Sequence, residues 1–164
     1  KSLGIQKKNN DTKQNRYRLM WMDVRYEPGT LKVVAFDKDG NPASEKEIKT
    51  AGKPHQIVLD SDVKTIKANG EDLCYVTVLV VDKNGNPCPT ATNQLTFKVK
   101  GEGTFRAACN GDATSLELFH LPTMKLFSGK LVVLIQSTED PGNIELSVSG
   151  KGLKKGNLTL RSFK

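Results

Sequence analysis

The segment Asp72–Pro87, DLCYVTVLVVDKNGNP, constrains the fold more than any other part of the chain. Successive side chains of a strand point to opposite faces, so alternate positions share a face. Val76, Val78 and Val80 fall on one face, and Thr77 and Leu79 fall on the other. One face is fully apolar and the other nearly so, which predicts a central strand of a β-sandwich. The strand ends where Gly85 suits the positive φ of a tight turn.

The segment Val33–Pro42 repeats this strand-and-turn pattern, so the chain contains at least two copies of one kind of β unit. The turns Asp37–Gly40 and Asp82–Gly85 also resemble the start of a calcium-binding loop. Such a loop needs glycine at its sixth position and an acid at its twelfth. Here the glycines come fourth, and the twelfth residues are Ile48 and Asn93. We therefore interpret both segments as tight turns and predict no metal site.

The whole chain is expected to be all-β, with turn signals every ~8–12 residues between short strands, as in an immunoglobulin-like β-sandwich. Strands are predicted at 18–24, 31–37, 45–50, 55–60, 72–81, 94–100, 104–109, 129–138, 143–150 and 153–161. The strand at 129–138 has apolar residues at successive positions, so we expect it to be buried on both faces. A single helical turn fits only Ser115–Phe119.

The segment Ala51-Gly52-Lys53-Pro54 is the predicted boundary between two consecutive units. Residues 53–164 form a complete Ig-like domain in this interpretation. Residues 1–52 offer about four strands, including a hairpin turning at Glu27–Thr30, which are too few to cover both faces of a sandwich. We therefore expect the first unit to be a truncated Ig-like domain with an exposed apolar face or an unpaired edge.

The net charge of +7 invites a nucleic-acid interpretation, but the 25 Lys and Arg are spread along the chain among 18 acids. No basic helix or RNA-binding aromatic motif accompanies them, so we predict no nucleic-acid partner. No apolar run reaches ~18 residues, so no membrane span is predicted. The three cysteines, Cys74, Cys88 and Cys109, cannot all pair, and Cys74 is predicted to be a small buried hydrophobe. Their redox state stays open.

Candidates for catalytic groups are the acid pairs Glu71-Asp72 and Glu139-Asp140 and the two histidines, His55 and His120. Glycoside hydrolysis needs two carboxyl groups facing each other across a cleft, whereas each pair here is adjacent and diverges from the backbone. Neither histidine has a nucleophile motif beside it. No phosphate loop or dinucleotide fingerprint is present. We therefore predict no catalytic residue and no cofactor in this chain.

Trp21, with Tyr17 and Tyr26, could form a sugar-stacking platform. A lone Trp in a strand of an Ig-like unit is more often a core residue, so Trp21 is a weak candidate for binding. The segment Asn110-Gly111-Asp112 is interpreted as a turn, although exposed loops at a sandwich end are where binding groups collect.

Several segments together resemble the C-terminal β-sandwich domains of bacterial β-galactosidases of glycoside hydrolase family 2. They are Lys1–Gly4, Arg18–Asp37, Ala51–Pro54, Ile66–Leu73 and Phe105–Asp112. In that family the two catalytic Glu residues lie on a (β/α)8 barrel upstream of these domains. The resemblance implies a non-catalytic accessory region of a hydrolase, which would brace the barrel, join subunits or touch a glycan.

The partners that the resemblance implies are the barrel and other domains of a parent chain, with carbohydrate and a second copy as further candidates. It also implies a periplasmic, secreted or cell-surface location. The alternative is a stand-alone Ig-like binding or adhesion module of a bacterial surface protein, because adhesin repeats carry a strand and turn similar to Val81–Pro87. The Trp-containing stretch Arg18–Leu31 favours the hydrolase.

Overall fold

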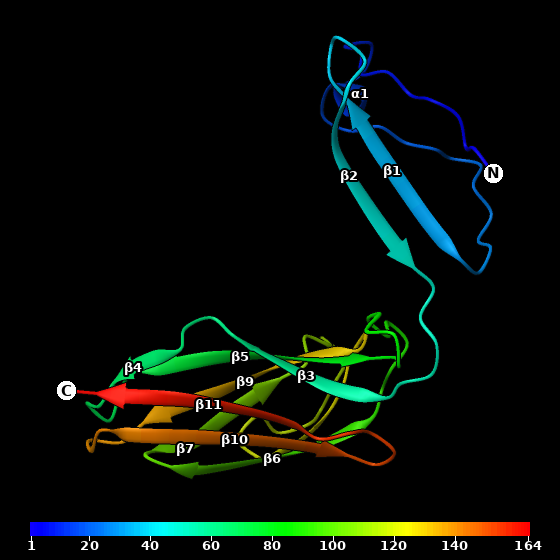
Figure 1. Cartoon of the computed structure of the whole chain (residues 1–164). Helices are drawn as coiled ribbons and strands as arrows, with labels where there is room; N and C mark the ends of the chain where they lie inside the picture. Colours follow the sequence, from blue (N-terminus) through cyan, green and yellow to red (C-terminus); the bar gives the residue numbers. More distant parts are fainter. The chain divides into compact units, whose positions relative to one another are not determined.

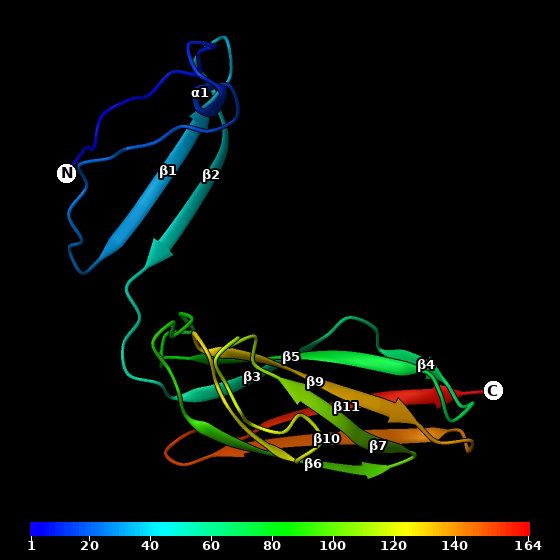
Figure 2. The same cartoon turned by 180° about the vertical axis from the view of Figure 1, so that it is seen from behind.

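A computed structural model describes all 164 residues and divides into two compact units, Lys1–Lys49 and Thr50–Lys164 (Figures 1 and 2). The chain is all-β apart from one short helix. No helix in it has the length and apolarity needed to cross a membrane.

The second unit consists of two β-sheets packed face to face, which Figures 1 and 2 show as two layers. The four-stranded sheet has the order β3 (Gln56–Ser61), β5 (Leu73–Val81), β9 (Lys130–Ser137), β7 (Gly103–Cys109). The five-stranded sheet has the order β4 (Thr65–Lys67), β11 (Gly156–Phe163), β10 (Gly142–Gly150), β6 (Gln94–Gly101), β8 (Thr123–Lys125). Neighbouring strands are antiparallel except β4 and β11, which are parallel. The strands predicted in residues 53–164 are therefore present, and β4 and β8 are two further short strands that were not predicted.

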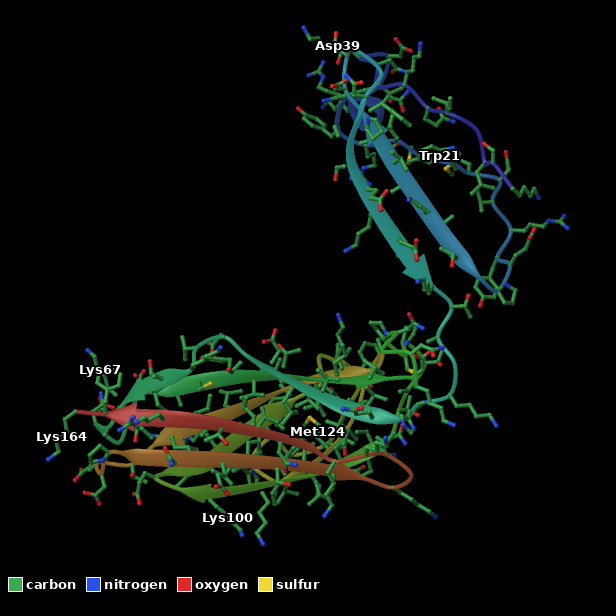
Figure 3. The ribbon with its side chains drawn as sticks, viewed as in Figure 1. Trp21, Asp39, Lys67, Lys100, Met124 and Lys164 are labelled. Atoms are coloured by element: carbon green, nitrogen blue, oxygen red, sulfur yellow. The ribbon has the colours of Figure 1, made fainter.

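The core lies between the two sheets because each strand turns its alternate apolar residues inward. Val76, Val78 and Val80 of β5 are fully buried there, as the alternation predicted. The opposite sheet contributes Leu95, Ile144 and Leu146, among others. Phe97 and Phe105 stack across the core with ring centroids 5.7 Å apart, and Met124 of β8 lies in the same interior (Figure 3).

The strand β5 is interior to its sheet, flanked by β3 and β9. The prediction that β9 is buried on both faces is wrong, because Val132 and Leu134 are only half-buried on its outer face. On the same face of β5, Tyr75 and Thr77 are exposed. The apolar runs therefore include outward-facing side chains that are only half-buried within the second unit.

The first unit contains α1 (Lys13–Tyr17), β1 (Thr30–Phe36) and β2 (Pro42–Lys49). The predicted strand at 18–24 and its hairpin with 31–37 are wrong, because 18–24 is irregular and β1 pairs with β2 instead. About four strands were expected and two are present. The helix lies before the first predicted strand, where no element was expected, and the Thr12 hydroxyl caps it by accepting a hydrogen bond from Asn15 N–H. No helical turn forms at Ser115–Phe119.

The β1–β2 hairpin has its ion pairs on one face and exposed apolar residues on the other, where Lys46 lies opposite Val33. Residues directly opposite in an antiparallel pair share a face. The ion pairs Lys32–Glu45 (2.7 Å) and Lys49–Glu47 (2.8 Å) lie on one side. On the other side Leu31 is opposite Ile48, with Val33 beside them, and all three are exposed.

Candidate functional site

The turn after β5 closes around the buried carboxylate of Asp82, which is only 4% exposed. Its Oδ1 accepts hydrogen bonds from the N–H groups of Asn84 and Asn86, both at 2.8 Å. Its Oδ2 accepts from Gly52 N–H at 2.7 Å and from the Asn86 side chain at 3.0 Å. The bond from Gly52, followed by that from the Asn86 side chain, holds the pKa of Asp82 far below its usual range. Four donors occupy the carboxylate, so this group ties the junction to the sandwich.

Asp37 repeats the arrangement in the first unit. Its Oδ1 accepts from Asp39 N–H and Asn41 N–H at 2.9 Å each. The Asn41 N–H bond is the main reason why the pKa of Asp37 is lowered. In both segments the aspartate oxygens face backbone N–H groups, and the glycines Gly40 and Gly85 have φ of 85° and 83°. The tight-turn interpretation of both segments is thus confirmed.

The acid pairs Glu71-Asp72 and Glu139-Asp140 lie on neighbouring loops at one end of the sandwich. The residues just before the two pairs are joined by a hydrogen bond from Gly70 N–H to Thr138 O at 3.2 Å. Asp72 is committed to backbone groups: it accepts from Lys67 N–H at 2.7 Å and from Leu73 N–H at 3.1 Å. No group of three or more His, Cys, Asp or Glu side chains in the chain could hold a metal ion.

The two histidines lie on different elements. The backbone of His55 precedes β3, with its N–H donating to Val81 O and its carbonyl accepting from Lys154 N–H. His120 lies in the loop between β7 and β8. Neither histidine has a hydrogen-bonded nucleophile that would make it a general base.

All three cysteines are free. Cys74 is a buried hydrophobe as predicted, and burial, with a smaller contribution from Asp62, raises the pKa of its thiol to about 12. Burial likewise raises the pKa of Cys88, and Cys109 is exposed. The two buried thiols are therefore structural.

Trp21 lies in the irregular segment between α1 and β1 (Figure 3), where its ring is half-buried. Its indole Nε1 donates to Gly4 O at 3.4 Å. The ring thus has neither the strand position predicted for it nor the full burial of a core residue. Tyr17 and Tyr26, the other predicted platform aromatics, are exposed.

The loop between β7 and β8 borders a surface hollow of about 510 Å³. It begins with the predicted turn Asn110-Gly111-Asp112, in which Gly111 has φ 77° and Asp112 N–H donates to the Asn110 side chain. The Asp112 carboxylate accepts from Thr114 N–H, which is the main reason why its pKa is lowered. Polar and apolar groups of the loop, Lys125 of β8 and three residues of the adjoining segments line the hollow: Asn110, Asp112, Ser115, Leu116, Glu117 and Lys125, with Thr92, Leu126 and Phe127. Sequence reasoning singled out the turn but missed the apolar residues that follow it, because they show no periodicity.

The fold defined by these elements is a two-layer β-sandwich. In the family comparison, residues 57–159 match the glycoside hydrolase family 2 C-terminal domain 5, and the chain belongs to this family. Residues 1–44 match a domain of unknown function, DUF4982. The chain thus carries C-terminal domains of family 2 glycosidases, as the resemblance predicted.

Known proteins resemble the chain over nearly its full length. The β-galactosidase BoGH2A of Bacteroides ovatus is 41% identical over 160 residues, which cover 98% of this chain and 18% of that protein. A β-galactosidase of Thermoanaerobacter pseudethanolicus is 30% identical over 87% of this chain and 17% of its own length. The crystal structure of a β-glycosidase from Bacteroides vulgatus matches with a TM-score of 0.80 at 33% identity, covering 84% of this chain and 18% of that one. The chain therefore spans less than a fifth of the length of these relatives.

Proposed function

We propose that this chain is the non-catalytic C-terminal accessory region of a bacterial glycosidase that hydrolyses β-galactosides. The 41% identity to BoGH2A across 98% of the chain is the observation that carries this proposal. The aligned region is only 18% of that protein, so a catalytic domain would lie in the remainder of the parent chain. The commitment of Asp72 to backbone N–H groups supports a structural part in that enzyme.

The test compares the parent enzyme with this chain alone on aryl β-galactosides, with aryl β-glucuronides as the second substrate. The glucuronides are included because a β-glucuronidase of Formosa agariphila is 26% identical over 94% of this chain. We expect the parent to hydrolyse the galactoside and the isolated chain to hydrolyse neither. Hydrolysis by the isolated chain, lost on changing Glu71, Asp72, Glu139 or Asp140, would contradict the proposal.

We further propose that both units are immunoglobulin-like, with the second unit a complete sandwich and the first unit the C-terminal part of another. Two observations support this: the nine strands of the second unit form two packed sheets, and the β1–β2 hairpin leaves Leu31, Val33 and Ile48 exposed on one face. Strands supplied by the parent chain would cover that face. Footprinting of the parent enzyme and of this chain alone tests whether such strands complete the sandwich. Lower reactivity of these side chains in the parent would support the proposal, and equal reactivity in the two samples would contradict it.

Glycan contact and location are proposed on the family resemblance. Trp21 is the candidate stacking residue, because its half-buried ring leaves an apolar surface in contact with water. Saturable galactoside binding by the parent that is weakened at least tenfold by Trp21→Ala, with folding retained, would support this role. A periplasmic or surface location would be contradicted by recovery of the parent protein from the cytoplasmic fraction.

A further inference from the structure

Large apolar side chains are exposed in the loop between β7 and β8 and just after β8, where Leu116 of the loop and Phe127 line the same hollow. We call this group the docking patch, and it consists of Leu116, Leu118, Phe119, Leu121 and Phe127. Leu116 is 95% exposed, and Leu118 and Phe119 are 56% and 54% exposed. A side chain of this size gains free energy by leaving water, so such a concentration usually marks an interaction surface.

The loop that carries the patch is fastened to both sheets. On the side of β7, Ala108 N–H donates to Phe119 O at 2.8 Å. On the side of β8, Lys125 N–H donates to the Glu117 carboxylate at 3.1 Å, and the Asn110 side chain donates to Lys125 O at 3.0 Å. The apolar side chains are thus presented on a hydrogen-bonded frame. A preorganised surface loses less conformational entropy when a partner binds.

The outer face of the five-stranded sheet provides a contrast within the same unit. A hollow of about 430 Å³ lies there over β6, β10 and β11. The residues that face outward around it are polar or charged: Lys98, Lys100, Glu145, Ser147, Asn157 and Thr159. Figure 3 shows Lys100 directed away from the core. This face is suited to water, whereas the docking patch is not.

We propose that the docking patch is the surface on which this unit packs against the preceding part of the parent chain. The inference rests on the proposed function, because it requires a longer parent enzyme. Most of the length of the relatives lies outside the aligned region, which makes a large partner surface available in the same molecule. Covalent connection raises the effective concentration of that surface to the millimolar range. An intramolecular partner is therefore favoured over a second copy.

Hydroxyl-radical footprinting of the purified parent enzyme tests the proposal. Phe119 and Phe163 make a matched pair, because both are Phe and they are 54% and 47% exposed. Phe163 lies in β11 and outside the patch. If the patch is covered, oxidation of Phe119 falls about tenfold relative to Phe163 in the monomeric parent. Equal oxidation of the two residues in a monomeric parent would overturn the proposal.

The variant Leu116→Asp tests the same contact by mutation. Leu116 is 95% exposed, so the change does not disturb the packing of the sandwich itself. It places a charge in the proposed interface, so oxidation of Phe119 rises to that of Phe163. Val63→Asp is the control, since Val63 is 41% exposed outside the patch and its change leaves the oxidation of Phe119 relative to Phe163 unaltered.

Other outcomes separate the two proposals. Protection of Phe119 that is lost when a dimeric parent is diluted to monomer would assign the patch to a second copy and overturn the intramolecular partner. A parent that hydrolyses no glycoside would contradict the proposed function, while the footprint would still decide whether the patch is covered. A parent that hydrolyses the glycoside but whose Phe119 is oxidised as much as Phe163 would overturn the docking proposal and leave the proposed function standing.

Discussion

At the scale of single residues, Asp82 shows how one carboxylate organises both a turn and a domain junction. Its backbone contacts to Asn84 and Asn86 close the turn, and its contact to Gly52 N–H holds a residue 30 positions earlier. A charged acceptor strengthens each of these hydrogen bonds. The sequence predicted the turn from its Asp-Lys-Asn-Gly composition, but nothing in it predicted the bond from Gly52.

This contact predicts a pH dependence of stability. The pKa of Asp82 is lowered in the folded state, so its stabilisation is fully present above the unfolded pKa of about 3.9 and is lost as pH falls below that value. We expect Asp82→Asn to lower the urea midpoint of the second unit at pH 7. The gap between wild type and variant should shrink below about pH 4.

The control for this measurement is Asp60→Asn, because Asp60 is an exposed residue of β3. Urea unfolding of wild type and both variants between pH 7 and pH 3 provides the comparison. A gap that stays constant down to pH 3 would show that the Asp82 carboxylate is not the stabilising group.

At the scale of secondary-structure elements, β5 has the role predicted from its sequence alone. Its alternation of valines placed one face in the core, and with nine residues it is longer than the strands on either side, β3 with six and β9 with eight. The error concerned β9, which was expected to be buried on both faces but has a half-buried outer face. An apolar run cannot distinguish a strand that is covered on both sides from one whose outer face is open.

Replacing Val78 by Asp should unfold the second unit. Val78 is fully buried at the middle of β5, and an unpaired charge there costs several kcal/mol, about 3 or more. Thr77→Asp is the matched control, because Thr77 is exposed on the opposite face of the same strand. Thermal unfolding followed by circular dichroism distinguishes them, and equal melting of both variants would show that β5 does not anchor the core.

The β1–β2 hairpin is the element whose stability depends most on a partner. Two-stranded sheets are marginal in water, and one face of this hairpin exposes Leu31, Val33 and Ile48. We expect the isolated chain to associate, or to be cleaved within residues 1–49 before residues 50–164. Sizing by light scattering with limited proteolysis measures both. A monomer that resists protease throughout would contradict this expectation.

At the scale of the whole molecule, the position of the boundary between the units determines which residues each needs to fold. The sequence placed it after Gly52, whereas the compact units divide after Lys49. Ala51 packs against the core of the second unit, and Gly52 N–H donates to Asp82. We therefore propose that residues 50–52 are part of the second unit and contribute to its free energy of unfolding.

Comparing chains 50–164 and 54–164 tests this assignment. The shorter chain lacks both the Ala51 contact and the Gly52 donor, so its urea midpoint should be lower. The buried Asp82 Oδ2 then keeps only the Asn86 side chain as a donor. Adding Asp82→Asn should lower the midpoint of the longer chain more than that of the shorter one. Equal urea midpoints of the unsubstituted chains 50–164 and 54–164 would place the boundary after residue 53.

In residues 53–164 the periodicity of the sequence by itself determined the longer strands, the face of each that lies in the core and the turns that end them. These features depend on local backbone geometry and on the alternation of apolar residues, which are written in neighbouring positions. Only the tertiary structure decided which strands pair and which apolar residues stay exposed. The stretch Arg18–Val24 has the alternation of a strand but no paired neighbour, and the exposed Leu116–Leu121 loop has no periodicity at all. Pairing and exposure depend on residues distant in the chain, so no local pattern could predict them.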